Sequence, residues 1–425
     1  PQEDLEIADA VYRRSREVYG DKAGWTKGWQ TIRGMAHFRL NNLKEALKDF
    51  SEGMEGWLSN VSRFRDYSRI KRFRMILDDY IHLLDKIRDT PWEREMGLDA
   101  GFESFRMSEA SRSQSVQWAL SASSARATVD DPETADLMRR EQDCAQQMAA
   151  IEAAMQVLAS APSDQQDPKL LRNLRQQLDT LRNAREAILS EIEKRAPNYA
   201  EIVRPRPASL SKVQGVLRPG EALISIYATD DGTYVWSIPY TGQPRFASVS
   251  LNKKDLQEMV IALRKSLDPK PLTLNDIPDF DVNLAHRLYR QLLEPVEEGW
   301  KGASDLLVTV NEPLGQIPFG TLVTASTEIE REKGELFSEY RKVPWLIRKA
   351  SITMLPSASS LIMLRTLQPP AGLKRFTFAG FGDPVFNPEQ VGALRETRQE
   401  RSLTVANKGN VEVNVRGIRL ISKGD

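Results

Sequence analysis

The side chains that could carry nucleophilic chemistry are few in this chain. It holds one cysteine, Cys144, and three histidines, His37, His82 and His286. A cysteine nucleophile needs an imidazole base or a helix N-terminus to hold it as a thiolate, and no histidine lies near Cys144 in the sequence. We therefore predict that Cys144 is structural. We expect all three histidines to lie on helices, with His286 at the surface.

Other reaction chemistries have little support in the sequence. Serine is plentiful, but no Gly-x-Ser-x-Gly nucleophile elbow occurs, and no spacing of His, Cys and Asp suits zinc. The Gly-Phe-Gly-Asp-Pro run at residues 380–384 lacks a following lysine, which favours a turn over a phosphate-binding loop. We predict no catalytic residue, cofactor site or metal site within the chain, and we expect catalytic residues beyond Asp425.

The composition is that of an ordinary globular protein, with 28% charged and 40% hydrophobic residues. Lys+Arg and Asp+Glu number 59 each, so no net charge draws the chain to nucleic acid or to an anionic membrane. No apolar run approaches the roughly 18 residues that a membrane span needs. The chain begins at Pro1 without a signal-peptide pattern. We expect a cytoplasmic protein whose native amino terminus is missing.

Residues 1–127 are predicted to be helical. In residues 28–50, small residues such as Gly34 would let two helices pack closely, Asn41-Asn42 marks a turn, and apolar residues then recur at helical spacing. This segment resembles one tetratricopeptide unit, a helix-turn-helix repeat of 34 residues. The resemblance implies helical repeats that bind a protein partner. It departs from the family pattern at His37, where an aromatic residue is usual, and near Leu58, where a proline is usual.

The helix predicted for residues 63–88 is locally basic, and two interpretations remain open. It carries arginines and a lysine on one side and an apolar stripe on the other. The cations are Arg63, Arg65, Arg69, Lys71, Arg72 and Arg74. They could bind an acidic partner, but acidic residues follow at Asp78, Asp79 and Asp85, which favours a solvated helix face.

Residues 128–196 are predicted to form an antiparallel helical hairpin with coiled-coil-like pairing. Asp131-Pro132 is a helix start signal, and apolar residues recur three or four apart along two polar segments that a Ser- and Pro-containing break separates. Cys144 lies in the first of these helices. The proline-rich residues 197–220 are predicted to be a linker.

From Glu221 onward the apolar pattern changes from helical to alternating, which predicts an α/β domain over residues 221–425 with a parallel sheet. A hairpin is expected at residues 222–238 around Asp231-Gly232. Buried strands are expected at residues 306–310, 350–355 and 375–379, with helices beginning after Asn252, at residues 281–297 and at residues 357–366.

The order of these segments resembles the CHAT family, bacterial cysteine peptidases with a caspase-like domain that follows helical repeats. Residues 306–322 (strand, acidic turn, then Leu-Gly-Gln-Ile-Pro-Phe-Gly-Thr-Leu), 345–361 and 378–384 are similar to the first three elements of that domain. Residues 108–120 resemble the helix that joins the repeats to the hairpin. The resemblance implies a caspase-like α/β fold and a peptide substrate.

The residues that perform the chemistry in the CHAT family are missing from this chain. The family's catalytic His follows one strand in a His-x-x-Thr-His-Gly-like setting and its Cys follows a later strand, and neither motif occurs here. We therefore expect the regulatory and partial peptidase region of a CHAT-family hydrolase, inactive by itself. The alternative is a non-enzymatic helical-repeat scaffold for protein–protein interaction.

Overall fold

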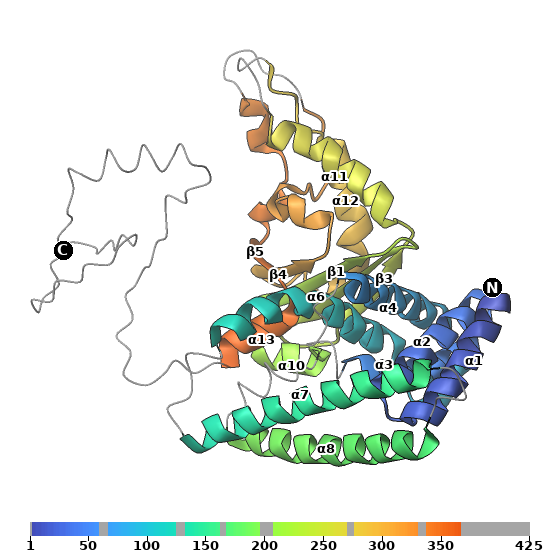
Figure 1. Cartoon of the computed structure of the whole chain (residues 1–425). Coiled ribbons are helices and arrows are strands. Elements are labelled where there is room, and N and C mark those ends of the chain that lie inside the picture. The colour runs from blue at the N-terminus through green and yellow to red at the C-terminus, as the bar shows by residue number, and fades with distance from the viewer. Residues whose placement is uncertain are drawn as a thin grey trace, which may run out of the picture. The chain divides into compact units, whose positions relative to one another are not determined.

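The computed structural model describes residues 2–58, 67–124, 132–161, 167–195, 207–269, 276–329 and 337–366. The chain divides into two compact units, Pro1–Leu367 and Gln368–Asp425, and every described residue lies in the first. The described part is mostly helical with one five-stranded mixed sheet (Figure 1), as the expected α plus α/β class requires. The predicted strand at residues 375–379 and the turn at residues 380–384 lie outside the described residues.

Three antiparallel helices begin the chain: α1 (Gln2–Tyr19), α2 (Gly24–Arg39) and α3 (Leu43–Leu58). Small residues let α2 and α3 approach closely, because a Cβ at Gly53 would meet the Thr31 side chain at 2.6 Å. Asn41 turns the chain between the two helices with a left-handed φ of 60°.

The next helices are α4 (Tyr67–Ile87), α5 (Pro91–Glu95) and α6 (Ala100–Ser124). The predicted apolar stripe of α4 is confirmed as core, and its members are buried: Ile76, Leu77, Tyr80, Ile81, Leu84 and Ile87. Of the basic residues, Arg63 and Arg65 lie outside the described residues, and Arg74 is exposed.

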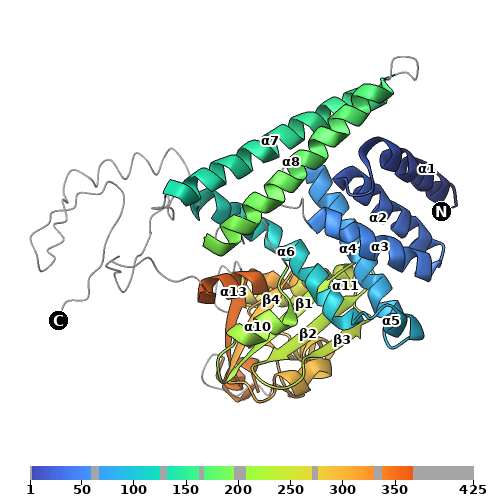
Figure 2. The same ribbon diagram turned by 90° about the horizontal axis from the view of Figure 1, so that it is seen from below.

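The predicted helical hairpin is confirmed as α7 (Pro132–Ser160) and α8 (Pro168–Arg195), which lie side by side in both views (Figures 1 and 2). Two ion pairs show that the helices are antiparallel. Arg195 at the end of α8 reaches Glu133 at the start of α7, and Arg185 reaches Glu141. At about 1.5 Å per residue, each helix is about 40 Å long.

The predicted linker at residues 197–220 contains a short helix, α10 (Leu210–Val216). Ser209 caps it by accepting a hydrogen bond from the Lys212 backbone at 3.3 Å. Leu210 and Val213 are buried, so this part of the segment is anchored in the core. Residues 196–206 lie outside the described part.

The sheet consists of β1 (Glu221–Ala228), β2 (Thr233–Pro239), β3 (Arg245–Val249), β4 (Asp305–Val310) and β5 (Ser351–Leu355). Its order is β3-β2-β1-β4-β5. β1, β4 and β5 are parallel, β2 pairs antiparallel with β1 in the predicted hairpin, and β3 pairs antiparallel with β2. The expected parallel sheet is therefore correct for three strands, and the hairpin makes the whole sheet mixed.

Helices cover both faces of the sheet (Figure 1). α11 (Lys253–Leu267) and α12 (Val282–Leu292) pack on the face formed by the even-numbered residues of β1, with Ile224 and Ile226 in that core. α4, α6, α10 and α13 (Ala358–Thr366) pack on the opposite face, against Leu223 and Tyr227. Asn252 caps α11 as predicted, accepting from the Asp255 backbone at 2.9 Å.

Short 3-10 helices fill the connections after α12: Glu294–Gly299, Leu314–Gln316, Phe319–Thr321, Ser338–Lys342 and Leu346–Arg348. The expected helix at residues 281–297 ends at Leu292, because Pro295 cannot continue an α-helix. The loop between Pro313 and Pro318 buries Leu314 and Ile317.

The expectation that residues 350–355 form a buried strand is wrong. β5 lies at one end of the strand order, and within the described part of the chain it pairs only with β4. Ser351, Thr353 and Met354 are exposed. A β-branched run predicts a strand well, but burial depends on which neighbours cover it.

Candidate functional site

A polar site interrupts the apolar face of the sheet beneath α6. Along β1, Leu223 and Tyr227 point into this core, and Ser225 takes the alternating position between them. On β4, Thr309 follows Leu307 in the same way, and Ser225 and Thr309 are register partners across the two strands. Both side chains are fully buried. Buried hydroxyl groups need hydrogen-bond partners, and α6 supplies one.

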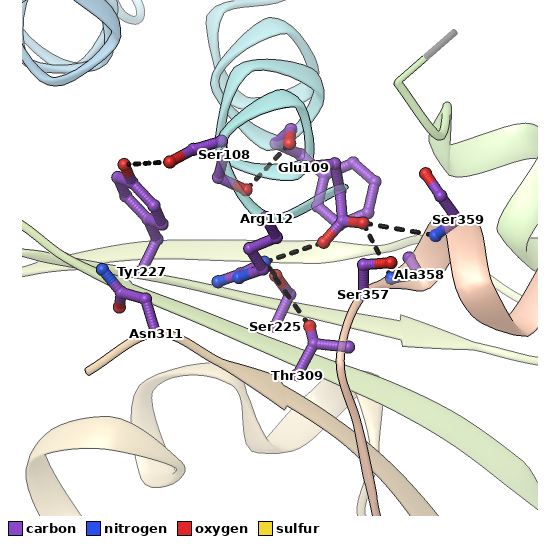
Figure 3. Close-up of polar contacts among 12 residues, drawn as sticks. Ser108, Glu109, Arg112, Ser225, Tyr227, Thr309, Asn311, Ser357, Ala358 and Ser359 are labelled. Carbon is purple, nitrogen blue, oxygen red and sulfur yellow. Dashed lines mark hydrogen bonds and ion pairs between the residues drawn. The ribbon is translucent and has the colours of Figure 1, made fainter. Parts of the chain in front are cut away.

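Arg112 of α6 is that partner (Figure 3). Its Nη1 donates to Ser225 Oγ at 2.7 Å and to Thr309 Oγ1 at 3.5 Å, and its Nη2 donates to the backbone carbonyl of Ile226. The side chain is only 3% exposed. The guanidinium also lies 5.4 Å from the centre of the Tyr227 ring. Arg112 therefore joins α6 to two adjacent strands near their carboxyl ends.

Glu109 neutralises the buried guanidinium and contacts a third element. Its Oε1 accepts from Arg112 Nη1 at 2.8 Å, and the glutamate side chain is 0% exposed. Its Oε2 accepts from the backbone N–H groups of Ala358 at 2.7 Å and Ser359 at 3.3 Å (Figure 3). These are the first N–H groups of α13, so Glu109 supplies a negative charge where a helix dipole favours it. Ser357 completes the cap by accepting from the Ser360 backbone.

The Glu109–Arg112 pair is sensitive to substitution of either residue, because both charges are buried. Removing two charges from water is costly, and only good geometry with further hydrogen bonds offsets that cost. Glu109 and Arg112 both have such bonds, to α13 and to the strands. Loss of one partner would leave the other charge buried, at a cost of about 3–5 kcal/mol. The pair thus ties α6, the sheet and α13 together with high specificity.

Two further polar contacts fix the same end of the sheet. Asn311, just after β4, accepts from the Ala228 backbone N–H and donates to the Ala228 carbonyl, both at 2.8 Å, which ties the ends of β1 and β4 together. Tyr227 donates its hydroxyl to Asp78 Oδ1 at 2.8 Å and lies 3.0 Å from Ser111 Oγ. The carboxyl ends of β1, β4 and β5 are the edge at which open α/β sheets usually place functional residues.

The structure places the few potential nucleophiles and bases apart from this site. Cys144 is half-buried on α7, in a small apolar cluster with Met138, Ile188 and Ile192. This packing is what a structural cysteine makes. The ion pair and hydroxyl groups at the site position elements, and they offer no thiol or imidazole for a reaction.

The three histidines lie on α2, α4 and α12. His37 faces Asn42 at 3.4 Å, and His82 lies 3.3 Å from Asp231 at the β1–β2 turn. The expectation of a surface position for His286 is wrong. It is half-buried, and its Nδ1 lies 2.9 Å from the Val323 carbonyl, so it holds the loop after β4 against α12.

A second feature is an open, polar pocket of about 610 Å³ over α1, α2 and α3. Its buried residue Gln30 donates to Glu52 at 2.7 Å, and Arg33 makes a two-bonded ion pair with Asp49 at 2.7 Å for each bond. The exposed rim includes Glu45 and Lys48. Charges of both signs line the pocket, so it is better able to contact a polar surface of another molecule than an apolar one.

A search of the described residues finds no group of three or more His, Cys, Asp and Glu side chains arranged to hold a metal ion. In the same part of the chain, no helix combines the length and the apolar character needed to cross a membrane.

Sequence reasoning missed Glu109 and Arg112 as site residues. Both lie in the joining helix at residues 108–120, but neither was distinguished within it. A usable signal was present: a Glu and an Arg three residues apart continue the helix face that carries buried Phe105 and Ser108. Ser225 and Thr309 similarly interrupt apolar alternation in buried strands.

No protein-family model, curated protein or solved structure matches this chain. Its function must therefore be inferred from the fold and from the contacts described above.

Proposed function

We propose that this chain is the regulatory and partial peptidase region of a CHAT-family cysteine protease. In this proposal α1–α3 belong to tetratricopeptide-like repeats that bind a protein partner, and the region after Glu221 is the first part of a caspase-like domain. The observation that carries the proposal is the buried Glu109–Arg112 pair, which connects the helical part to β1, β4 and α13 at one edge of the sheet.

The order of the elements supports this assignment. A helical region, a long hairpin and a sheet with parallel strands β1, β4 and β5 follow one another as in the family that the sequence resembles. The close packing of α2 on α3 at Gly34 and Gly53 is also what a helix-turn-helix repeat needs. In this proposal, the polar pocket over these helices would be the surface that binds the protein partner.

The proposed chemistry needs residues beyond Asp425. A downstream cysteine would attack the peptide carbonyl as a thiolate, and a histidine would take up its proton and pass it to the leaving amine. The residues of this chain would position that machinery. Arg112 and Asn311 hold the carboxyl ends of β1 and β4, and Glu109 holds the start of α13. The structural effect of partner binding to the helices would be transmitted to the sheet through α6.

The test compares the 425-residue chain with a version extended to the natural stop codon. Both are assayed with peptide mixtures and with a thiol-reactive probe. We expect cleavage only in the extended version, with loss of activity when its downstream cysteine is replaced. Activity of the short chain that disappears in Cys144→Ala would overturn the proposal, and so would an extension that lacks both a Cys and a His.

A second candidate is a non-enzymatic scaffold in which the helices bind protein and the sheet only supports them. The pocket over α1–α3 favours it, because that surface is already present in this chain without any downstream residue. The sequence beyond Asp425 discriminates between the two: a stop codon there supports the scaffold, and a His and a Cys after further strands support the peptidase.

A further inference from the structure

The contact between α4 and the β1–β2 hairpin gathers an unusual number of ionisable groups. From α4 come Asp78, Asp79, His82 and Asp85, three of which share one helix face. The hairpin turn presents Asp230 and Asp231, with Tyr227 and Tyr234 on its strands. The cations and further donors that face this cluster come from α2, α4, α6 and the turn after α4: Arg39, Arg74, Arg88, Ser111 and Arg112.

The hairpin turn is rigid, so its two carboxylates are held against α4. The Thr229 backbone donates to the Gly232 carbonyl at 2.8 Å, and the Thr229 hydroxyl contacts the same residue at 3.0 Å. Asp231 lies 3.3 Å from His82, and the Phe38 ring of α2 packs edge-on to the His82 ring at 5.3 Å. Helices α2 and α4 and the sheet therefore meet at one point.

Asp78 is the centre of this contact. It is half-buried and accepts the Tyr227 hydroxyl at 2.8 Å. Burial raises the pKa of Asp78 to about 7, with Asp230 and Asp79 adding to the rise and the Tyr227 hydrogen bond and Arg74 opposing it. Burial also raises the pKa of Asp79, and Asp231 adds to that rise. Both carboxyl groups are thus held toward their neutral forms by the docked arrangement.

We propose that the contact between α4 and the β1–β2 hairpin is a proton-sensitive joint, tight in mildly acidic solution and looser in mildly alkaline solution. Above neutral pH, the ionised carboxylates of α4 face those of the hairpin turn and repel them. Below it, Asp78 takes up a proton, which removes its repulsion with Asp230 of the hairpin turn. This joint lies on the same strand as the Arg112 contact but is separate from the proposed peptidase function.

The expected size follows from linkage. An undocked Asp78 has its ordinary pKa of 3.8, and the docked one has a pKa of about 7. The docked form therefore binds more protons between these two values, and its advantage grows as the pH falls through about 7. Between about pH 8 and about pH 6 the opening equilibrium should decrease about tenfold from this group alone.

The experiment measures amide hydrogen exchange of the whole chain near pH 6 and near pH 8, corrected for the intrinsic pH dependence of exchange. In the native chain, the opening equilibrium constant measured at the amides of β1 and β2 should be about tenfold lower near pH 6 than near pH 8. In Asp78→Asn the difference should fall below about twofold. Asp268→Asn is the control, because that exposed acid directly follows α11, forms an ion pair with Arg264 and should leave the tenfold difference intact.

The Tyr227→Phe variant provides a second test. A purely structural role of Tyr227 would not change the pH at the midpoint of the opening transition. The tyrosine hydroxyl opposes the rise of the Asp78 pKa, so its removal should move the midpoint of the opening transition to higher pH. A native chain whose hairpin amides open equally at both pH values would overturn the proposal. The same tenfold change in Asp78→Asn, or an unmoved midpoint in Tyr227→Phe, would also overturn it.

Discussion

Ser225 of β1 and Thr309 of β4 are register partners in the parallel part of the sheet, and one guanidinium contacts both of their hydroxyl groups. Arg112 can reach both because neighbouring strands in a sheet lie about 4.8 Å apart. The contact replaces what would otherwise be an apolar interface between α6 and the sheet. Its geometry is directional, so it fixes the position of α6 along the strands more strictly than apolar packing would.

Replacing Arg112 should therefore destabilise the chain strongly. In Arg112→Met the Glu109 carboxylate stays buried without its cation, and we expect a loss of about 3–5 kcal/mol in the free energy of unfolding. Urea denaturation followed by circular dichroism measures it. The matched control is Arg106→Met on the same helix, which breaks a less buried pair with Glu103 of the same spacing. It should cost about 1 kcal/mol or less, and equal losses in the two variants would contradict this role of Arg112.

A double-mutant cycle separates the value of the pair from the cost of an unpaired charge. Glu109→Leu should also destabilise, because it leaves Arg112 charged in the core and removes the acceptor of the Ala358 N–H. The double variant Glu109→Leu, Arg112→Met contains no buried charge, so it should be more stable than the Arg112→Met variant. Strictly additive losses in unfolding experiments would show that the two side chains do not act as a unit.

The pH dependence of stability offers another test at the opposite end of β1. Arg365 of α13 makes a two-bonded ion pair with Glu221, and this hydrogen bonding lowers the pKa of Glu221 below its ordinary value of 4.5. The sign follows directly: the pair contributes stability above that ordinary pKa and loses it as the pH falls through the lowered value. Arg365→Met should destabilise the chain near neutral pH and have a smaller effect near about pH 3. Thermal unfolding at both pH values checks this, and an equal effect at both would contradict it.

The elements themselves could be predicted well where the signals were local. The Asp231-Gly232 turn, the Asn252 cap and the apolar runs of β1 and β4 each specify their conformation within a few residues, and all are present. The helical hairpin followed from apolar spacing together with the Asp131-Pro132 start signal and the break between the two segments. Local propensity and hydrophobic pattern agree in these segments, and that agreement makes their secondary structure predictable from the sequence.

The site could not be predicted in the same way, because its partners are distant in the sequence. Arg112 and Thr309 are 197 residues apart, and Glu109 and Ala358 are 249 apart. Only the packing of α6 across the carboxyl ends of β1 and β4 brings them together. The prediction that β5 is buried was wrong for a related reason. The residue pattern of a strand indicates its conformation but not its position in the sheet.

The exposed strand β5 leads to a final prediction about association. Within the described part of the chain β5 pairs on one side only, and Thr353 and Met354 are exposed there. Unpaired strand edges promote edge-to-edge association, and a charged side chain on the edge opposes it. Sedimentation velocity at high concentration should show self-association of the 425-residue chain that Thr353→Lys reduces at least severalfold. Ser248→Lys, on the exposed side of β3 at the other end of the sheet, is the control. A monomeric native chain, or equal reduction by both variants, would show that the β5 edge does not drive association.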